Sequence, residues 1–150
     1  MNRARTSPDE QGTTTVLVIG FVVVVATLVA VVVDASAAYL QRQRLTALAD
    51  SAAIAAADGV QGRQVYEGGL PEPSEDARVA VDPRAAQAYV AAHLDALGAG
   101  VTYPGLSWSV RTEGDQVVVE LRAPLELPLG VPGVGDPVIA GTSSAVVVLE

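Results

Sequence analysis

Few side chains in this sequence could carry out catalysis. His93 is the single histidine, and the chain contains neither cysteine nor lysine. No serine stands in the Gly-x-Ser-x-Gly context of a hydrolase nucleophile, so the usual pairs of nucleophile and base are missing. His93 is most simply a helix residue at the margin of a core. A hydrolase that uses two carboxylates stays open as the alternative, but we expect a protein that is not an enzyme.

Two stretches resemble ligand-binding motifs without having their geometry. Glu72, Glu75 and Asp76 offer carboxylates, but they lack the alternating spacing and the glycine pivot of a calcium-binding EF-hand loop. The glycines of residues 130–135 stand in the wrong order for a dinucleotide-binding loop, and a strand pattern follows them. We therefore expect no metal, no cofactor and no small-molecule substrate.

Composition narrows the class of protein further. The formal net charge is -8, and the arginines form no basic patch interleaved with aromatic residues. Nucleic acid is therefore not an expected partner. The absence of cysteine excludes a disulfide framework and thiolate metal sites. The chain has 150 residues, but much of its apolar content lies near the N-terminus, so the remainder can build only a small core.

The segment Thr13–Val33 carries no formal charge. As a helix it would rise roughly 30 Å, the thickness of the hydrocarbon core of a bilayer. A domain this small could not bury a helix that is apolar on every side. We interpret the segment as a transmembrane helix, with residues 1–12 as a short tail or leader.

A cleavable signal peptide is the competing interpretation, because Ala35-Ser36-Ala37 resembles a small-residue cleavage site. The apolar run is longer than the usual core of a signal peptide, about 7–15 residues, and Asp34 stands directly before the site. Charge does not fix the orientation, because Arg3 and Arg5 on one side are matched by Arg42 and Arg44 on the other.

After the span, alanine dominates one face of the expected helix. Leu45, Leu48, Ala49, Ala52 and Ala56 recur at intervals of three, four and seven residues and form a narrow stripe. Small side chains let a neighbouring helix approach closely, so the stripe is a candidate helix-packing surface. Alanine is also the best helix former, so the alternative is a stem that is only rigid. Both interpretations predict one transmembrane and stem helix over residues 13–58.

This N-terminal region resembles the TadE/TadG-like proteins of Tad (Flp) pilus assembly. The residues that carry the resemblance are Gly12, Asp34, Tyr39, Arg42, Arg44, Leu45, Ala49, Asp50, Ala52, Ala53 and Ala56. The resemblance covers about the first 60 residues and implies a membrane protein whose residues 1–12 form a cytoplasmic tail or leader and whose head lies outside the cytoplasm. Larger members carry a metal motif, Asp-x-Ser-x-Ser, but the Asp34-Ala-Ser-Ala-Ala sequence here lacks the second serine.

The resemblance also implies a candidate processing site between Gly12 and Thr13. Type IV prepilins and many TadE-type proteins are cut after such a glycine, and the mature prepilin helix carries glutamate at its fifth position. Counted from Thr13, the fifth residue here is Leu17, which cannot make the charge pair attributed to that glutamate. We predict that the leader is retained.

The remaining residues predict a small α+β head. Residues 59–82 are rich in glycine, proline and acids and are expected to form a linker loop. Asp82-Pro83 and Gly98 bracket a second helix, whose core face would contain Ala86, Tyr89, Val90, His93 and Leu97.

Three strand patterns follow. Leu106, Trp108 and Val110 alternate with polar residues, and a Gly114-Asp115 turn leads to Val117, Val119 and Leu121. A last run extends from Val138 to Leu149. We expect one helix packed on a three-stranded antiparallel sheet over residues 83–150, with Trp108 buried against the helix, as in a pilin-like protein.

The function expected from these patterns is that of a minor pilin-like or membrane-anchored assembly component of a Tad/Flp pilus. Its partners would be other pilus subunits, the membrane assembly platform and the lipid bilayer. The alternative is a tethered or secreted binding protein of the cell envelope, with a cleaved signal peptide and no pilus role.

Overall fold

The computed structural model describes residues 9–68, 81–125, 127–129 and 137–147. Its elements, in chain order, are α1 (Asp9–Gly68), α2 (Pro83–Ala96), α3 (Ala99–Thr102), β1 (Ser107–Glu113), β2 (Gln116–Pro124) and β3 (Val138–Val146). One long helix and a three-stranded sheet confirm the predicted α+β class. Glu72, Glu75, Asp76 and the glycines of residues 130–135 lie outside the described residues.

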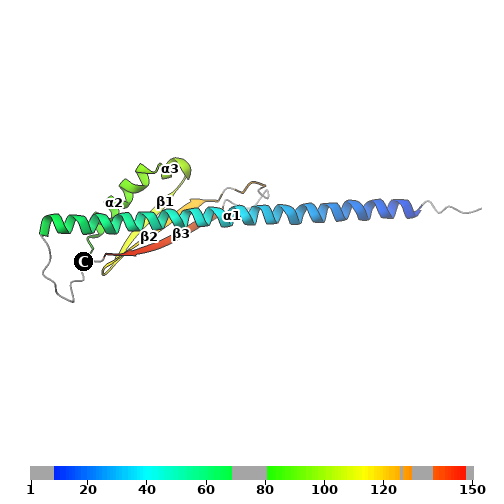
Figure 1. Ribbon diagram of the computed structural model, residues 1–150. Helices are drawn as coiled ribbons and strands as arrows, with labels where there is room; N and C mark the ends of the chain where they lie inside the picture. The colour runs from blue at the N-terminus through cyan, green and yellow to red at the C-terminus, as the bar shows by residue number, and fades with distance from the viewer. Residues whose placement is uncertain (1–8, 69–80, 126, 130–136, 148–150) are drawn as a thin grey trace, which may run out of the picture.

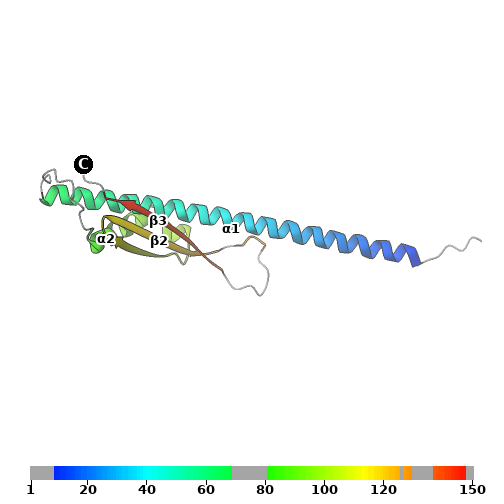
Figure 2. The same ribbon diagram turned by 90° about the horizontal axis from the view of Figure 1, so that it is seen from below.

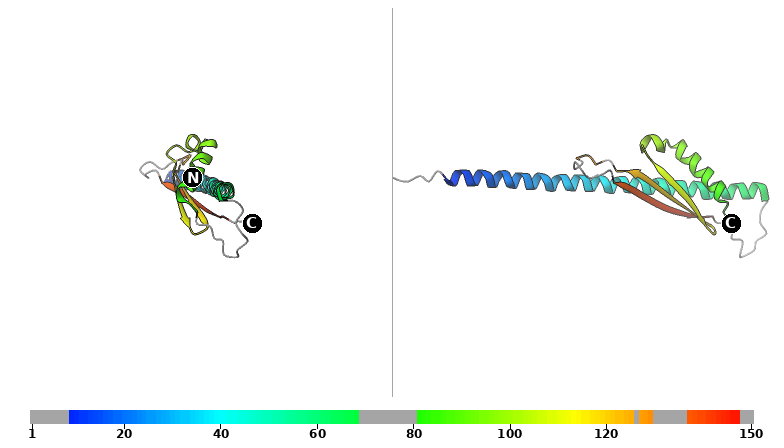
Figure 3. Two further views of the ribbon diagram at one scale, coloured as in Figure 1. Left: turned by 90° about the vertical axis from the view of Figure 1, so that its left-hand side faces the viewer. Right: turned by 180° about the vertical axis from the view of Figure 1, so that it is seen from behind.

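Helix α1 has 60 residues and is therefore roughly 90 Å long. Its N-terminal half extends alone, and α2, α3 and the sheet all lie beside its C-terminal half (Figure 1). The views from below and from behind show the same arrangement (Figures 2 and 3). The chain therefore has two parts along one axis: a bare helix and a head that is packed alongside the continuation of that helix.

The predicted end of the first helix at residue 58 was wrong. Helix α1 continues through Gly59 and Gly62 to Gly68, so the first ten residues of the predicted linker are helical. Gly59 serves packing, because a Cβ atom at this position would lie 2.6 Å from the ring of Tyr89. Glycine costs a helix only about 1 kcal/mol, which the packing of α2 on this turn can offset.

Helix α2 begins and ends at the predicted signals. The Asp82 side chain accepts a hydrogen bond from the backbone N–H of Arg84, and Pro83 occupies the first turn. At the other end Gly98 adopts a left-handed conformation, with φ +61°. Its core face differs from the prediction at three positions: Ala85 and Leu94 are buried, whereas Leu97 is 54% exposed.

The sheet is antiparallel, in the order β1-β2-β3. Strands β1 and β2 are joined at Gly114, which has a φ of +64° and so confirms the predicted turn. On β2, Val117, Val119 and Leu121 are fully buried, as their alternation predicts. The opposite face carries polar residues, so the sheet has one core face and one solvated face.

The prediction for Trp108 was wrong, because this side chain is 40% exposed. The register places it opposite Leu121, on the core side of the sheet as expected. However, α1 packs on β2 and β3, while β1 has its helix contacts with α2. Trp108 therefore lies on an edge strand that the helices cover only in part.

Candidate functional site

The N-terminal half of α1 exposes an apolar surface on all its sides. The large apolar side chains between Val16 and Val33 are each 40–72% exposed. Helix α1 is long and apolar enough to cross a membrane, with a mean hydropathy of 3.3 in its most apolar window, and that window is 0% buried. It is therefore not a core helix of the described fold, where such a segment would be covered.

The hydroxyl groups of this segment and of its end are satisfied within the helix. Thr27 Oγ1 donates to the carbonyl of Val23 at 2.9 Å, and Ser36 Oγ donates to the carbonyl of Val32 at 2.7 Å. In a bilayer core no water is present to pair such groups, so internal bonds of this kind suit a membrane-spanning helix.

The head first contacts the helix at Asp34, directly after the apolar run. An Asp34 carboxylate oxygen accepts a hydrogen bond from the backbone N–H of Leu129, which belongs to the connection between β2 and β3. Leu129 itself is 56% exposed. Asp34 thus lies where the bare helix ends and the head begins, the position at which a membrane surface would lie.

The alanine stripe is buried by the chain's own head. Leu45, Ala49, Ala52 and Ala56 have no exposed surface, and Leu48 packs against the same core. Helix α1 contacts α2, β2 and β3 along this surface. The interpretation as a packing surface therefore applies first within the subunit, where the neighbouring helix is α2.

Strand β3 approaches the backbone of α1 at Gly141. A Cβ atom at this position would lie 2.6 Å from both the carbonyl carbon of Leu45 and the backbone nitrogen of Thr46. No side chain larger than a hydrogen atom fits between a strand and a helix at that separation.

Two hydrogen bonds lie along α1, one on either side of the Gly141 contact. Ser143 Oγ donates to an Asp50 carboxylate oxygen at 2.8 Å, and Gln41 Nε2 donates to the carbonyl of Pro124 at 2.8 Å. The side chains of Asp34, Gln41 and Asp50 thus fix the head to the helix at three points along its length.

His93 makes a further contact between α2 and α1. Its Nε2 lies 3.2 Å from Ser51 Oγ, and the Ser51 hydroxyl donates to the carbonyl of Leu48 at 2.9 Å. Ser51 and His93 are thus within hydrogen-bond distance of each other and join α2 to α1. The geometry assigns His93 to packing of the head.

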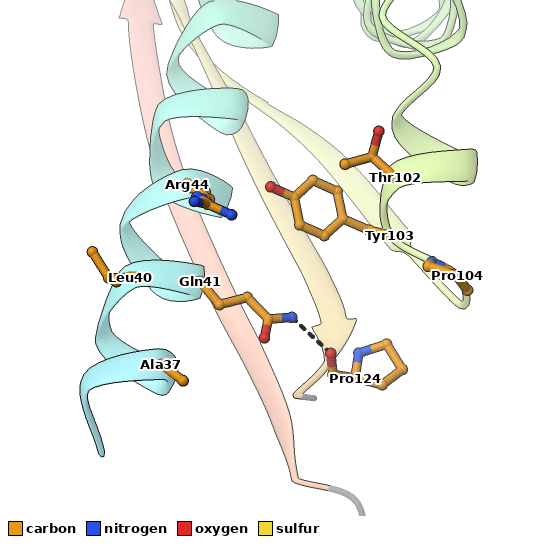
Figure 4. A pocket seen from close by; sticks show the side chains of 8 residues that line it. All are labelled: Ala37, Leu40, Gln41, Arg44, Thr102, Tyr103, Pro104 and Pro124. Carbon is orange, nitrogen blue, oxygen red and sulfur yellow. Dashed lines mark hydrogen bonds between the residues drawn. The ribbon is translucent and has the colours of Figure 1, made fainter. Parts of the chain in front are cut away.

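Two grooves lie on either side of α1 close to Asp34. The first has a volume of about 340 Å³ and is lined by Ala37, Leu40, Gln41, Arg44, Thr102, Tyr103, Pro104 and Pro124 (Figure 4). The second, of about 480 Å³, is lined by Ala38, Tyr39, Arg42, Leu125, Val138, Ile139 and Ala140. Each groove therefore contains one arginine and one tyrosine.

The structure divides the family-motif residues into two groups. Asp34 and Asp50 bind the head, whereas Tyr39, Arg42 and Arg44 are exposed and line the grooves. The candidate processing site, Gly12 and Thr13, lies within α1 near its start. The predicted site residues thus follow one another along a single helix, and the described residues contain no group of acids and histidines that could hold a metal ion.

One stretch of α1 contains the bare apolar run, the buried alanine stripe and the two aspartates, Asp34 and Asp50, that bind the head. Residues 12–59 match the family described as putative Flp pilus-assembly TadE/G-like. The TadE/G-like segment begins three residues after the start of α1 and ends at Gly59, where Tyr89 packs. No curated protein and no solved structure matched the chain.

Sequence reasoning identified Tyr89 and His93 on the face of α2 that packs on the TadE/G-like segment, but it did not identify Gly141, Ser143 or Gln41 at the contact between α1 and the sheet. Gly141 had a usable signal, because an isolated glycine within a strand pattern suggests that another backbone approaches closely. Ser143 and Gln41 had none, because their partners lie 93 and 83 residues away in the sequence.

Proposed function

We propose that this protein is a membrane-anchored, minor pilin-like component of a Flp/Tad pilus-assembly system, and that it acts by binding rather than by catalysis. The observation that carries the proposal is the coincidence between the TadE/G-like match and the helix. The matched residues 12–59 include the whole bare apolar run and nearly all of the surface on which the head packs.

The architecture supports an anchoring and positioning role. The contacts between α1 and the head extend from Asp34 to Val60, roughly 40 Å along the helix. Such a long contact, with glycines at two close approaches, holds the head in one orientation relative to the span. A partner that binds the head is therefore held at a fixed distance from the membrane surface.

The proposed arrangement has residues 13–33 in the membrane and the head on the extracytoplasmic side. Other pilus subunits and the membrane assembly platform would be the partners. Gly12 and Thr13 lie within α1, near its start, which supports retention of the leader. Because Leu17 stands at the fifth position after Gly12, we assign the protein to an accessory or minor role instead of the main filament subunit.

The rival function is a cell-envelope binding protein released by a signal peptidase. Cleavage after Ala37 would remove Asp34 and thereby its bond to Leu129, and it would divide the TadE/G-like segment in two. We favour the anchored protein, since both the bond and the family match join the span to the head.

Membrane fractionation followed by intact-mass measurement of the mature chain tests the proposal. We expect a protein that resists alkaline extraction from membranes, retains residues 1–12 and co-purifies with pilus subunits. A mature chain that begins at Ala38 would refute the anchored role. A chain that begins at Thr13 would contradict retention of the leader only.

A further inference from the structure

We propose that the two grooves beside α1 bind the phosphodiester headgroups of anionic phospholipids, with Arg44 and Arg42 as the phosphate-binding residues. This inference rests on the proposed membrane anchoring. It assigns a lipid ligand to Arg42 and to Arg44, which take no part in the packing of the head on α1.

The position of the arginines along α1 supports a lipid ligand. If the hydrocarbon region ends near Val33, the Cα atoms of Arg42 and Arg44 lie roughly 13 Å and 16 Å beyond it. The Cα–Cβ bonds of a helix tilt toward its N-terminus, here toward the span, and an arginine side chain is long enough to reach the headgroup layer from either position. Both guanidinium groups then lie within a Debye length, about 8–10 Å, of the headgroup layer, where anionic lipids attract cations.

The residues that line the first groove change from apolar to charged with distance from the span, as a phospholipid changes from its acyl chains to its phosphate. Ala37 and Leu40 line the end that lies closer to the span, and Leu40 is 52% exposed. Arg44 lies one to two turns further along α1, and the hydroxyl end of Tyr103 points toward the same space (Figure 4). An acyl chain on the apolar end and a phosphate between Arg44 and Tyr103 fit this order.

The second groove repeats the order on the other side of the helix. Ala38 and Tyr39 lie closer to the span than Arg42, and Tyr39 is 68% exposed. Tyrosine at this position is typical of a membrane interface, where its ring lies among the headgroups.

The charges in the two grooves favour anionic over zwitterionic headgroups. The ion pair between Arg122 and Glu120 lies on the sheet, and neither residue lines either groove. No aspartate or glutamate is among the described residues that line either groove, so the amine of a zwitterionic headgroup would find no carboxylate there. The net charge of the whole chain is -8, so these arginines differ in sign from the protein as a whole.

Native mass spectrometry of the full chain, released from detergent micelles, tests the inference. Phosphatidylglycerol or phosphatidylcholine is added in equal amounts, and the retained lipid is measured for the wild type and for Arg42→Gln/Arg44→Gln. Attraction to an anionic surface changes affinity roughly fivefold for each arginine, and each groove contains one arginine, so the double variant should lose about fivefold in its preference for phosphatidylglycerol at each groove. The matched control is Arg84→Gln/Arg111→Gln, which removes the same charge from exposed head positions and should keep the preference.

Three results would overturn the inference. The first is an unchanged phosphatidylglycerol preference in Arg42→Gln/Arg44→Gln. The second is displacement of the lipid by millimolar inorganic phosphate, which would show a site for free anions. The third is a lipid-independent dimer that is lost in the same variant, which would assign the arginines to a second copy of the chain.

Fractionation of the same variants separates this inference from the proposed function. If the wild type and Arg42→Gln/Arg44→Gln both resist alkaline extraction but show equal lipid preference, the lipid sites are refuted and the anchor remains. If the wild type itself is extracted, membrane anchoring fails and the lipid inference fails with it.

Discussion

Replacement of Gly141 by alanine tests the docking of the head on α1 most directly. The new Cβ atom would lie 2.6 Å from two backbone atoms of Leu45 and Thr46, whereas ordinary contacts begin near 3.4 Å. Strand β3 must therefore move away by about 0.8 Å, the difference between these distances. A helix backbone cannot rotate aside as a side chain can, so the strain falls on the whole interface.

The magnitude follows from two opposing effects. Overpacking of a close contact costs roughly 1–3 kcal/mol, and alanine in a strand is otherwise better than glycine by about 0.5–1 kcal/mol. Because the clash is with backbone atoms that cannot move aside, the overpacking cost should be near 2–3 kcal/mol, which leaves a net loss in the free energy of unfolding of about 1–2.5 kcal/mol. In a folded unit of about 100 residues, this lowers the Tm by about 4–20 °C.

Thermal unfolding of the full chain in detergent, followed by near-ultraviolet circular dichroism, provides the measurement. Gly62→Ala is the matched control, because a Cβ atom there has no neighbour within 4 Å and its helical position favours alanine. The control should keep or raise the Tm. If Gly141→Ala unfolds within about 1 °C of the wild type, less than even 1 kcal/mol would produce, the close approach of β3 to α1 is wrong.

Of three further predictions, two concern the same interface and one concerns Trp108 on the edge strand β1. Ala52→Leu should cost about 1–3 kcal/mol of head stability because Ala52 is fully buried, while Ala47→Leu on the exposed face should stay within about 0.5 kcal/mol in chemical denaturation. Fluorescence of Trp108 in the folded protein should be quenched by acrylamide and shift little on unfolding, since the side chain is 40% exposed; strong protection would contradict its position. Ser143→Ala should lower stability by less than about 1.5 kcal/mol, because the bond to Asp50 is exposed, and a larger loss in the unfolding free energy would show that this bond is buried.

The elements of this fold that depend on local signals could be predicted from the sequence. Asp82-Pro83 and Gly98 bracket α2 because capping involves residues within one turn of each other. The alternation of Val117, Val119 and Leu121 identifies the core face of β2 for the same reason. The uncharged run from Thr13 predicts a helix exposed to lipid because the rest of the chain is too small to cover it.

The errors come from contacts between distant segments. Gly59 resembles a helix stop in the sequence, and only the ring of Tyr89, thirty residues later, explains why it lies inside the helix. Trp108 lies on the predicted face of β1. Which helix covers that face, however, depends on how α1, α2 and the sheet pack together. Local periodicity assigns a side chain to a face of an element without indicating what covers that face.

The alanine stripe both forms part of the buried core and keeps the head close to the axis of α1. Strand β3 approaches the backbone of α1 at Leu45 because Gly141 has no side chain, and α2 approaches at Gly59 for the same reason. The small side chains of Ala49, Ala52 and Ala56 between these two points keep the head close to the axis of the helix. A bulkier stripe would bury more apolar area but hold the head further away, and the molecule would then be wider along its stem. We infer that Ala49, Ala52 and Ala56 bury less apolar area than larger side chains would, and that the molecule is narrower as a result. Gly59 and Gly141, at the two closest approaches, make it narrower in the same way.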